Sequence, residues 1–506
     1  MRSKAFALAV IGASISLALA QRAARAEQQP APAQPGAPAS TSGLDLAALD
    51  RTADACGNFY QFACGGWLAQ HPLPADQSSY GRFHELQERN NEILHQVLEQ
   101  ASSAPTDADT RKIGDYYGSC MDETAIASKA LTPLDEDFKR IGSIATAADL
   151  PVVLAALHSK GANVFFSFGS SPDFKDAASV IAVVDQGGLG LPDRDYYLKD
   201  DANSQKLRQE YVAHVGRMLQ LAGDPAAQAD AEAQAVMRIE TALAKSALDR
   251  VSRRAPANVY HKMTTAELRA LTPAFDWTAY LRDLHVPAAA AINVSQPEFM
   301  KGMNAVLAST PVADLKTYLR WQMLNGNANF LPKPFVDESF AFTKVLTGAR
   351  EQRPRWKRCV DYTDGDLGEV VGKAFIAQAF GAEGKTRTLE MVKAIEHAMD
   401  KDIQEIAWMS PETRAQAAAK LKSVANKIGY PDRWRDYSTL RIVRGDALGN
   451  SQRANVFELH RQLAKIGKPV DKSEWAMTPP TVNAYYNPLE NNINFPAGIL
   501  QPPFYS

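Results

Sequence analysis

Apolar residues recur every three or four positions through most of the chain after residue 44, and glycines, prolines and short polar runs interrupt them. This spacing puts the apolar side chains on one face of a helix, so it predicts a mainly helical fold with small β elements. We predict a helix over residues 82–100. A helical hairpin is predicted around residues 207–219, with a stop at Gly223 and a first-turn proline at Pro225. A third helix should open at Ser410 and run to residue 424.

Strand signals are fewer and short. Residues 164–168 and 180–184 are β-branched or aromatic runs flanked by turn residues, which predicts a small sheet inserted among helices. Residues 482–486 and 492–495 predict two strands around a turn at 487–491. The glycines of residues 187–197 do not make a nucleotide loop, because Leu191 and Pro192 interrupt the required spacing. We interpret that segment as a structural turn.

The length and charge of the chain limit its partners. A chain of 506 residues is long enough for roughly two to four folded units with a sizeable core. Its net charge is −2, from 55 basic and 57 acidic residues. Such a balance creates no overall field that would attract nucleic acid or an anionic membrane surface. We therefore expect partners to be selected by pockets.

The N-terminus has the layout of a secretory signal peptide. Arg2 and Lys4 precede an apolar stretch over residues 5–20, and small residues at 18–20 and 24–26 offer cleavage sites. The alternative is an uncleaved anchor, but the stretch is shorter than the ~20 residues that a membrane span needs. We assign residues 1–26 to a signal peptide and 27–43, rich in proline and alanine, to a flexible tether. The protein is then exported to the periplasm or beyond, without a stable membrane anchor.

Four cysteines, Cys56, Cys64, Cys120 and Cys359, are disulfide candidates in an exported protein. Their spacing fits no zinc pattern, and four cysteines allow three pairings that the residues alone do not distinguish. A local bridge between Cys56 and Cys64 is one of the possibilities.

The nine histidines include no pair four residues apart with a glutamate beside the first, the arrangement that places two imidazoles and a base on one helix face. His84 and His95 are eleven positions apart, which is about 16 Å along a helix, so they cannot share an ion. His84 with Glu88 is interpreted as a solvated helix face. No metal ligand or catalytic residue is assigned within residues 1–506.

Several motifs occur together in one order along the chain. They lie at residues 56–67, 116–122, 189–197, 318–321, 356–359, 428–431 and, most extensively, 475–506. Together they resemble the neprilysin and endothelin-converting enzyme family of zinc metalloendopeptidases. The resemblance covers almost everything after residue 50.

The resemblance implies a domain plan. A large helical N-terminal domain, here residues 44–435, caps a thermolysin-like (zincin) catalytic lobe. Residues 436–474 would connect the two, and 475–506 would begin the lobe with its substrate-binding edge strand. In the family the zinc-binding His-Glu-x-x-His helix follows that strand, so we expect the chain to be truncated before its zinc site and inactive alone.

The same resemblance implies a disulfide between Cys120 and Cys359, and partners beyond Ser506 for Cys56 and Cys64. It also implies that the Asn483 side chain and the Ala484 backbone hold the main chain of a peptide substrate. The alternative for Asn483 is a turn or cap residue in an ordinary hairpin.

One departure from the family bears on specificity. The mammalian member has an arginine that grips the free carboxylate of short peptides, and Ser79 stands there in this chain; His84 and Gln87 replace a nearby aspartate and arginine. Without the guanidinium, we expect weak preference for dipeptide release and cleavage inside oligopeptides. The overall prediction is a zinc-dependent endopeptidase; the alternative is an exported, non-catalytic peptide-binding protein on the same fold.

Overall fold

The computed structural model describes residues 45–287 and 291–505. The predicted signal peptide and the tether therefore lie outside the described residues. The chain divides into two compact units, Met1–Gln70 and His71–Ser506. In the described residues, no helix is both long and apolar enough to cross a membrane.

The first unit contains a short 3-10 helix, η1 (Leu46–Ala48), and α2 (Phe59–Gln70). The two lie close together because Gly66 has no side chain: a Cβ there would lie 2.3 Å from the carbonyl oxygen of Ala47. Cys56 and Cys64 are both free thiols in this unit. The local bridge between them is thus not formed.

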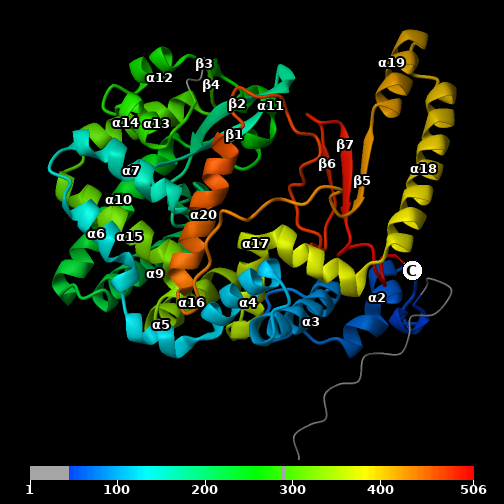
Figure 1. Ribbon diagram of the computed structural model, residues 1–506, viewed down its shortest axis with the longest axis horizontal. Helices are drawn as coiled ribbons and strands as arrows, with labels where there is room; N and C mark the ends of the chain where they lie inside the picture. The colour runs from blue at the N-terminus through cyan, green and yellow to red at the C-terminus, as the bar shows by residue number, and fades with distance from the viewer. Residues whose placement is uncertain (1–44, 288–290, 506) are drawn as a thin grey trace, which may run out of the picture. The chain divides into compact units, whose positions relative to one another are not determined.

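The second unit is mainly helical, with two small sheets, as the periodicity predicts (Figure 1). Its long helices are α3 (Arg82–Ser103), α4 (Ala108–Met121), α9 (Ala202–Leu221), α10 (Ala226–Ser246), α14 (Pro297–Ser309), α15 (Val312–Asn327), α16 (Lys333–Thr347), α17 (Arg355–Ala379), α18 (Ala382–Glu405), α19 (Pro411–Lys422) and α20 (Ala447–Leu463). Shorter helices are α5 (Glu123–Lys129), α6 (Asp135–Gly142), α7 (Leu150–Ser159), α8 (Asp195–Leu198), α11 (Pro256–Val259), α12 (Thr265–Leu271) and α13 (Trp277–Asp283).

The predicted helices form at the expected places. Helix α3 covers residues 82–100, and the hairpin is α9 and α10. Pro225 is the N-cap residue of α10 and not its first helical residue, a shift of one position. Ser410 caps α19, its hydroxyl accepting a hydrogen bond from the backbone N–H of Thr413 at 3.2 Å.

The first sheet has four strands in the order β1-β2-β4-β3: β1 (Phe166–Asp173), β2 (Asp176–Gln186), β4 (Ile292–Val294) and β3 (Lys262–Met263). β1 and β2 contain the two predicted strand segments and pair as an antiparallel hairpin, which the sequence analysis did not specify. The first strand starts two residues later than predicted, because Phe165 has a φ of +55°, which is not extended backbone. Tyr318 holds this bend: its hydroxyl accepts from the Phe165 N–H at 3.0 Å and donates to the Gly188 carbonyl at 2.9 Å.

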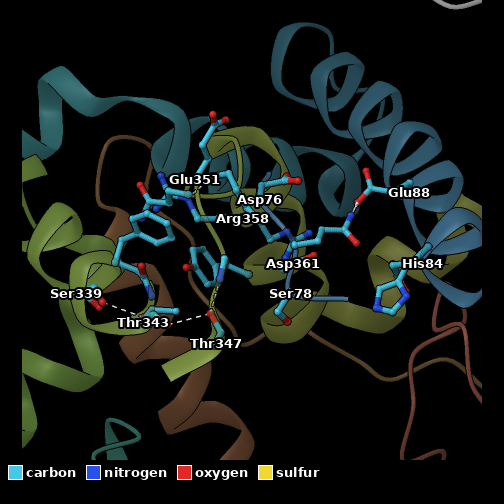
Figure 2. A pocket seen from close by; sticks show the side chains of 18 residues that line it. Asp76, Ser78, His84, Glu88, Ser339, Thr343, Thr347, Glu351, Arg358 and Asp361 are labelled. Carbon is cyan, nitrogen blue, oxygen red and sulfur yellow. Dashed lines mark hydrogen bonds and ion pairs between the residues drawn. The ribbon is translucent and has the colours of Figure 1, made fainter. Parts of the chain in front are cut away.

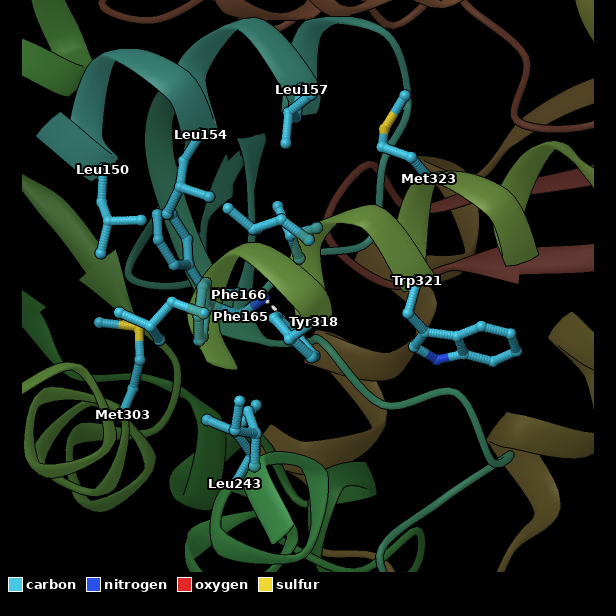
Figure 3. Packing of buried hydrophobic residues seen from close by; sticks show 14 of the residues in the cluster. Leu150, Leu154, Leu157, Phe165, Phe166, Leu243, Met303, Tyr318, Trp321 and Met323 are labelled. Carbon is cyan, nitrogen blue, oxygen red and sulfur yellow. Dashed lines mark hydrogen bonds between the residues drawn. The ribbon is translucent and has the colours of Figure 1, made fainter. Parts of the chain in front are cut away.

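Helices pack around this sheet to form the first core, which takes its buried side chains from residues 134–342 and from Leu448, Leu463 and Ile466. Figure 3 shows Phe165, Phe166, Tyr318 and Trp321 among aliphatic side chains of neighbouring helices. The three additions come from residues 436–474, the segment predicted to connect domains. That segment contains α20 and also hydrogen-bonds along β2, for example from Gly467 N to Val180 O at 2.9 Å.

The second core takes its side chains from residues 94–120, 359–392, 428–440 and 454–500. A disulfide between Cys120 of α4 and Cys359 of α17 crosses it. This is the pairing that the family resemblance implies.

The second sheet lies beside the second core. It has three strands in the order β5-β7-β6: β5 (Ala425–Gly429), β7 (Asn492–Pro496) and β6 (Tyr485–Asn487). β5 is parallel to β7, and β6 is antiparallel to it. Figure 1 shows the three strands side by side, next to α18 and α19. The sheet therefore joins residues 425–429 to the 475–506 segment, on either side of the predicted boundary at 435.

Candidate functional site

β6 is an edge strand. Its one neighbour in the described sheet is β7, so its other side presents backbone groups that no strand of this sheet pairs. Asn483 and Ala484 come directly before it. Asn483 is exposed and Ala484 is half-buried. The structure thus places both predicted binding residues at the open edge of the sheet.

The Asn483 side chain makes a local contact. Its Oδ1 accepts a hydrogen bond from the Ala484 N–H at 2.8 Å. The strand itself starts at Tyr485, three residues later than the predicted start at residue 482. The Asn483 Nδ2 has no hydrogen-bond partner among the described residues.

The aromatic residues of β6 fix the strand. The Tyr485 hydroxyl accepts from the Ala476 N–H at 2.8 Å, and burial raises the pKa of this phenol, which keeps it neutral. The Tyr486 hydroxyl donates to Asn491 Oδ1 at 3.0 Å across the turn. On β7, the buried Asn494 donates to Asn492 Oδ1 at 2.6 Å. Both ends of the hairpin are thus held by side-chain hydrogen bonds.

The turn that precedes the edge rests on α17. It consists of Thr478, Pro479, Pro480 and Thr481, closed by a hydrogen bond from Thr481 N to Thr478 O at 3.1 Å. The Thr478 hydroxyl donates to Asp364 Oδ2 of α17 at 2.7 Å. From α3, the buried Asn90 Nδ2 donates to Pro480 O at 3.1 Å and to Gly498 O at 3.0 Å.

A cavity of about 670 Å³ lies between α3, α16 and α17. In Figure 2, His84 and Glu88 come from α3, Ser339, Thr343 and Thr347 from α16, and Arg358 and Asp361 from α17. Sequence reasoning assigned no cavity here, because the three helices are far apart along the chain. The one signal available was His84 and Gln87, which the comparison with the mammalian family member had already singled out; both line the cavity.

Several charged groups that line the cavity have charged partners, some of them outside the lining. Arg353 pairs with Asp361, and Lys357 pairs with Glu88 and lies 3.8 Å from Asp76. Arg358 donates from Nε to the Arg353 carbonyl at 3.2 Å. Ser79 is exposed, with its Oγ 3.5 Å from His84 Nε2. The guanidinium groups of Arg353 and Arg358 therefore lie in the cavity. Neither occupies the position of Ser79, where the mammalian family member has its arginine.

The other histidine considered as a ligand is structural. His95 stacks on Trp356 with ring centroids 4.5 Å apart, and its Nδ1 lies 2.9 Å from the Tyr117 hydroxyl. Within residues 45–287 and 291–505, no group of three or more His, Cys, Asp or Glu side chains is placed to hold a metal ion.

Comparisons with known proteins identify the family. The family model described as Peptidase family M13 matches residues 55–431, about three-quarters of the chain. This chain belongs to peptidase family M13. It is 34% identical to human endothelin-converting enzyme 1 over 486 residues and 31% identical to neprilysin-3 of Drosophila melanogaster over 489 residues. Each alignment covers 91% of this chain, which spans 62% of the length of each relative.

Solved structures of M13 peptidases share the fold. The inhibitor complex of the zinc metalloprotease Zmp1 of Mycobacterium tuberculosis superposes with a TM-score of 0.87 at 36% identity, covering 92% of this chain and 71% of Zmp1. PepO of Lactobacillus rhamnosis gives a TM-score of 0.81 at 21% identity, covering 89% of this chain and 72% of PepO, and shows the fold alone. The predicted class, mainly helical with small β elements as in M13 zincins, is confirmed.

Proposed function

We propose that this chain supplies peptide binding for zinc-dependent cleavage of oligopeptides, with Asn483 and Ala484 as the substrate-binding residues. The observation that carries the proposal is the open edge of β6 with an exposed asparagine at its start. An extended peptide can add to such an edge as a further strand, and its main chain then supplies most of the affinity. The free Nδ2 of Asn483 can donate to a peptide carbonyl.

The small side chain of Ala484 suits the same role. A peptide strand lies about 4.8 Å from the strand to which it adds, and the single methyl group of Ala484 leaves room for this close approach. Ala484 is also half-buried, which fixes its backbone. Binding requires the Ala484 N–H to exchange the Asn483 side chain for the peptide, a local rearrangement of one hydrogen bond.

Zinc is the cofactor expected for an M13 peptidase, and Zmp1 is a zinc metalloprotease. The described residues of this chain do not form a ligand set for it. We therefore derive no step of bond cleavage here, and no residue of this chain is given a catalytic role. The residues of the site bind and orient a peptide.

The C-terminal group of the peptide is the second part of the proposal. Ser79 offers no guanidinium, and Arg353 already pairs with Asp361, so we expect a free carboxylate to add little affinity. Measuring the dissociation constants of one oligopeptide with a free and with an amidated C-terminus tests this. A strong preference for the free acid would contradict it, and Arg358→Ala would then show whether the cavity arginine is responsible.

The Asn483→Ala variant tests the binding edge directly. We expect the dissociation constant for an unstructured oligopeptide to be about ten times larger, because one hydrogen bond to the peptide main chain is lost. Asn203→Ala, an exposed asparagine on α9, is the matched control and should bind as the unsubstituted chain does. Equal affinity of the two variants would overturn the assignment of Asn483.

Catalysis and location need separate measurements. Sequencing the source coding region past the Ser506 codon distinguishes the readings: a continuation with His-Glu-x-x-His supports the peptidase, and a stop codon supports a non-catalytic peptide-binding protein. We also propose export with cleavage within residues 18–26. Cell fractionation and N-terminal sequencing of the mature protein test this, and an intact Met1 in the cytoplasmic fraction would contradict it.

A further inference from the structure

The turn at residues 478–481 packs against two glycines of α17 through the side chains of Thr478 and Pro479. A Cβ added at Gly368 would lie 2.2 Å from Thr478 Cγ2, and one at Gly372 would lie 2.5 Å from Pro479 Cδ. Both distances are below 3.0 Å, so a larger residue at either position would have to displace the turn. By contrast, a Cβ at Gly365 of the same helix would meet nothing within 4 Å.

The carbonyl groups of Thr478, Pro479 and Pro480 all accept hydrogen bonds. Thr478 O accepts from Thr481 N, and Pro479 O accepts from Gly498 N at 2.8 Å. Pro480 O has no backbone partner and accepts from Asn90 Nδ2, which also binds Gly498 O. The prolines cannot donate, so side chains of distant helices must hold this turn in place.

Asp364 holds the other end of the turn. Its Oδ2 accepts from the Thr478 hydroxyl, while its Oδ1 is buried without a partner among the described residues. Helix α17 departs from helical geometry at Leu367, three residues further on. A buried carboxylate with one neutral donor is costly. Its presence here is therefore better explained by the placement of Thr478 than by stability.

We propose that Asn90 and Asp364 are positioning residues for peptide binding: from α3 and α17 they clamp the 478–481 turn and so fix the edge at Asn483 and Ala484. Two residues separate the turn from Ala484, so any movement of the turn passes directly to the edge. The proposal rests on the proposed peptide-binding function of that edge. It adds the two residues, distant in sequence, that keep the edge ready for a peptide.

The adjacent asparagines provide the test. Asn90→Asp keeps the shape but removes the Nδ2 donor from the Pro480 and Gly498 carbonyls. Asn91→Asp is the matched control: Asn91 is also buried, but its Nδ2 has no partner among the described residues. We expect Asn90→Asp to weaken oligopeptide binding about tenfold, with Asn91→Asp unchanged. If Asn90→Asp unfolds the chain, Gly368→Ala against Gly365→Ala makes the same comparison.

Hydrogen exchange separates positioning from general stability. Without peptide, Asn90→Asp and Gly368→Ala should speed exchange of the amides of residues 483–487 several-fold and leave the β1–β2 hairpin unchanged. Thr478→Val, which removes the donor to Asp364, should act alike. Unchanged exchange and affinity in these variants would overturn the inference. If the unsubstituted chain binds no peptide, the proposed function fails, and the exchange measurement alone still decides whether the clamp exists.

Discussion

The two cores of the second unit each bury a carboxyl group, and they treat it differently. In the first core, Glu240 is fully buried and accepts from Tyr197 at 2.7 Å, Tyr211 at 2.8 Å, Gln322 at 2.9 Å and Trp321 at 3.2 Å. In the second, Asp364 has the Thr478 hydroxyl and one buried oxygen without a partner. Burial raises the pKa of each to about 7.

The two carboxyl groups differ in how far apart in the chain their partners lie. The donors around Glu240 come from α8, α9 and α15, so the carboxyl ties together one region of structure and is satisfied by it. Asp364 reaches a single turn that comes 114 residues later in the chain. Both oxygens of Glu240 have partners within one region of the core, whereas the partly satisfied Asp364 lies where we propose that the binding edge is held.

The largest expected effect is that of Glu240→Ala. It leaves the buried hydroxyl groups of Tyr197 and Tyr211 without an acceptor and removes one of the two acceptors of the Gln322 amide, so the free energy of unfolding should fall by about 3–5 kcal/mol. Urea denaturation measures it, with Glu390→Ala, an exposed residue of α18, as the control expected within about 0.5 kcal/mol of the parent. A decrease in the free energy of unfolding below about 1 kcal/mol would show that the hydrogen bonds to Glu240 do not stabilise the first core as proposed.

Replacing Cys120 and Cys359 by serine should come next. The disulfide closes a loop with a sequence separation of 239 between segments of the second core, so its loss should cost about 2–5 kcal/mol. The double variant Cys56→Ser/Cys64→Ser removes no disulfide and should have the same free energy of unfolding as the parent. Urea denaturation measures both effects. Equal denaturation midpoints for the two double variants would mean that the second core does not depend on the disulfide.

The pH dependence sharpens the contrast. The folded-state pKa of each group, about 7, lies above its ordinary value of 4.5 for Glu240 and 3.8 for Asp364. The folded chain therefore binds these protons more tightly than the unfolded chain. Stability is greatest below pH 4 for this pair and is lost as the pH rises toward 7, by an amount on the order of 1 kcal/mol or more.

The amide variants separate the two contributions. Asp364→Asn and Glu240→Gln should each flatten the fall in unfolding free energy between pH 5 and pH 8. Glu240→Gln should also lower stability at both pH values, because an amide NH₂ faces hydroxyl donors there. Chemical denaturation at the two pH values measures this. A slope unchanged by either variant would contradict the assignment of these carboxyl groups.

The smallest expected effect is at α17. Gly365→Ala should raise the free energy of unfolding by up to about 1 kcal/mol, because alanine favours a helix and the position is open. Thermal denaturation measures the gain. A loss there as large as that of Gly368→Ala would mean that the seat of the 478–481 turn extends further along the helix than the contacts show.

Prediction from the sequence succeeded where a signal was local. The helices at residues 82–103, 202–246 and 411–422 follow from apolar spacing and turn residues, and so does the existence of the strands β1 and β2, though not their pairing. β5 was missed because residues 425–429 carry no alternation of their own and become a strand by pairing with β7. The cavity was missed for the same reason, since its walls come from residues far apart along the chain.

The candidate site divides in the same way. Asn483 and Ala484 were named because a continuous motif surrounds them, and their roles stay a prediction. Asn90 interrupts the apolar stripe of α3 that runs through Leu86, Leu94 and Val97, but the sequence does not show which groups it binds. Asp364 carries no sequence signal.

The sequence by itself determined the family, the helical class and the residues of the edge strand, because periodicity and continuous motifs are properties of neighbouring residues. The tertiary structure alone decided which buried groups meet. These groups are the four donors around Glu240, the single donor to Asp364, and the carbonyls bound by Asn90. Their contacts join residues up to 408 positions apart in the chain. Such contacts arise from packing, and no local pattern encodes them.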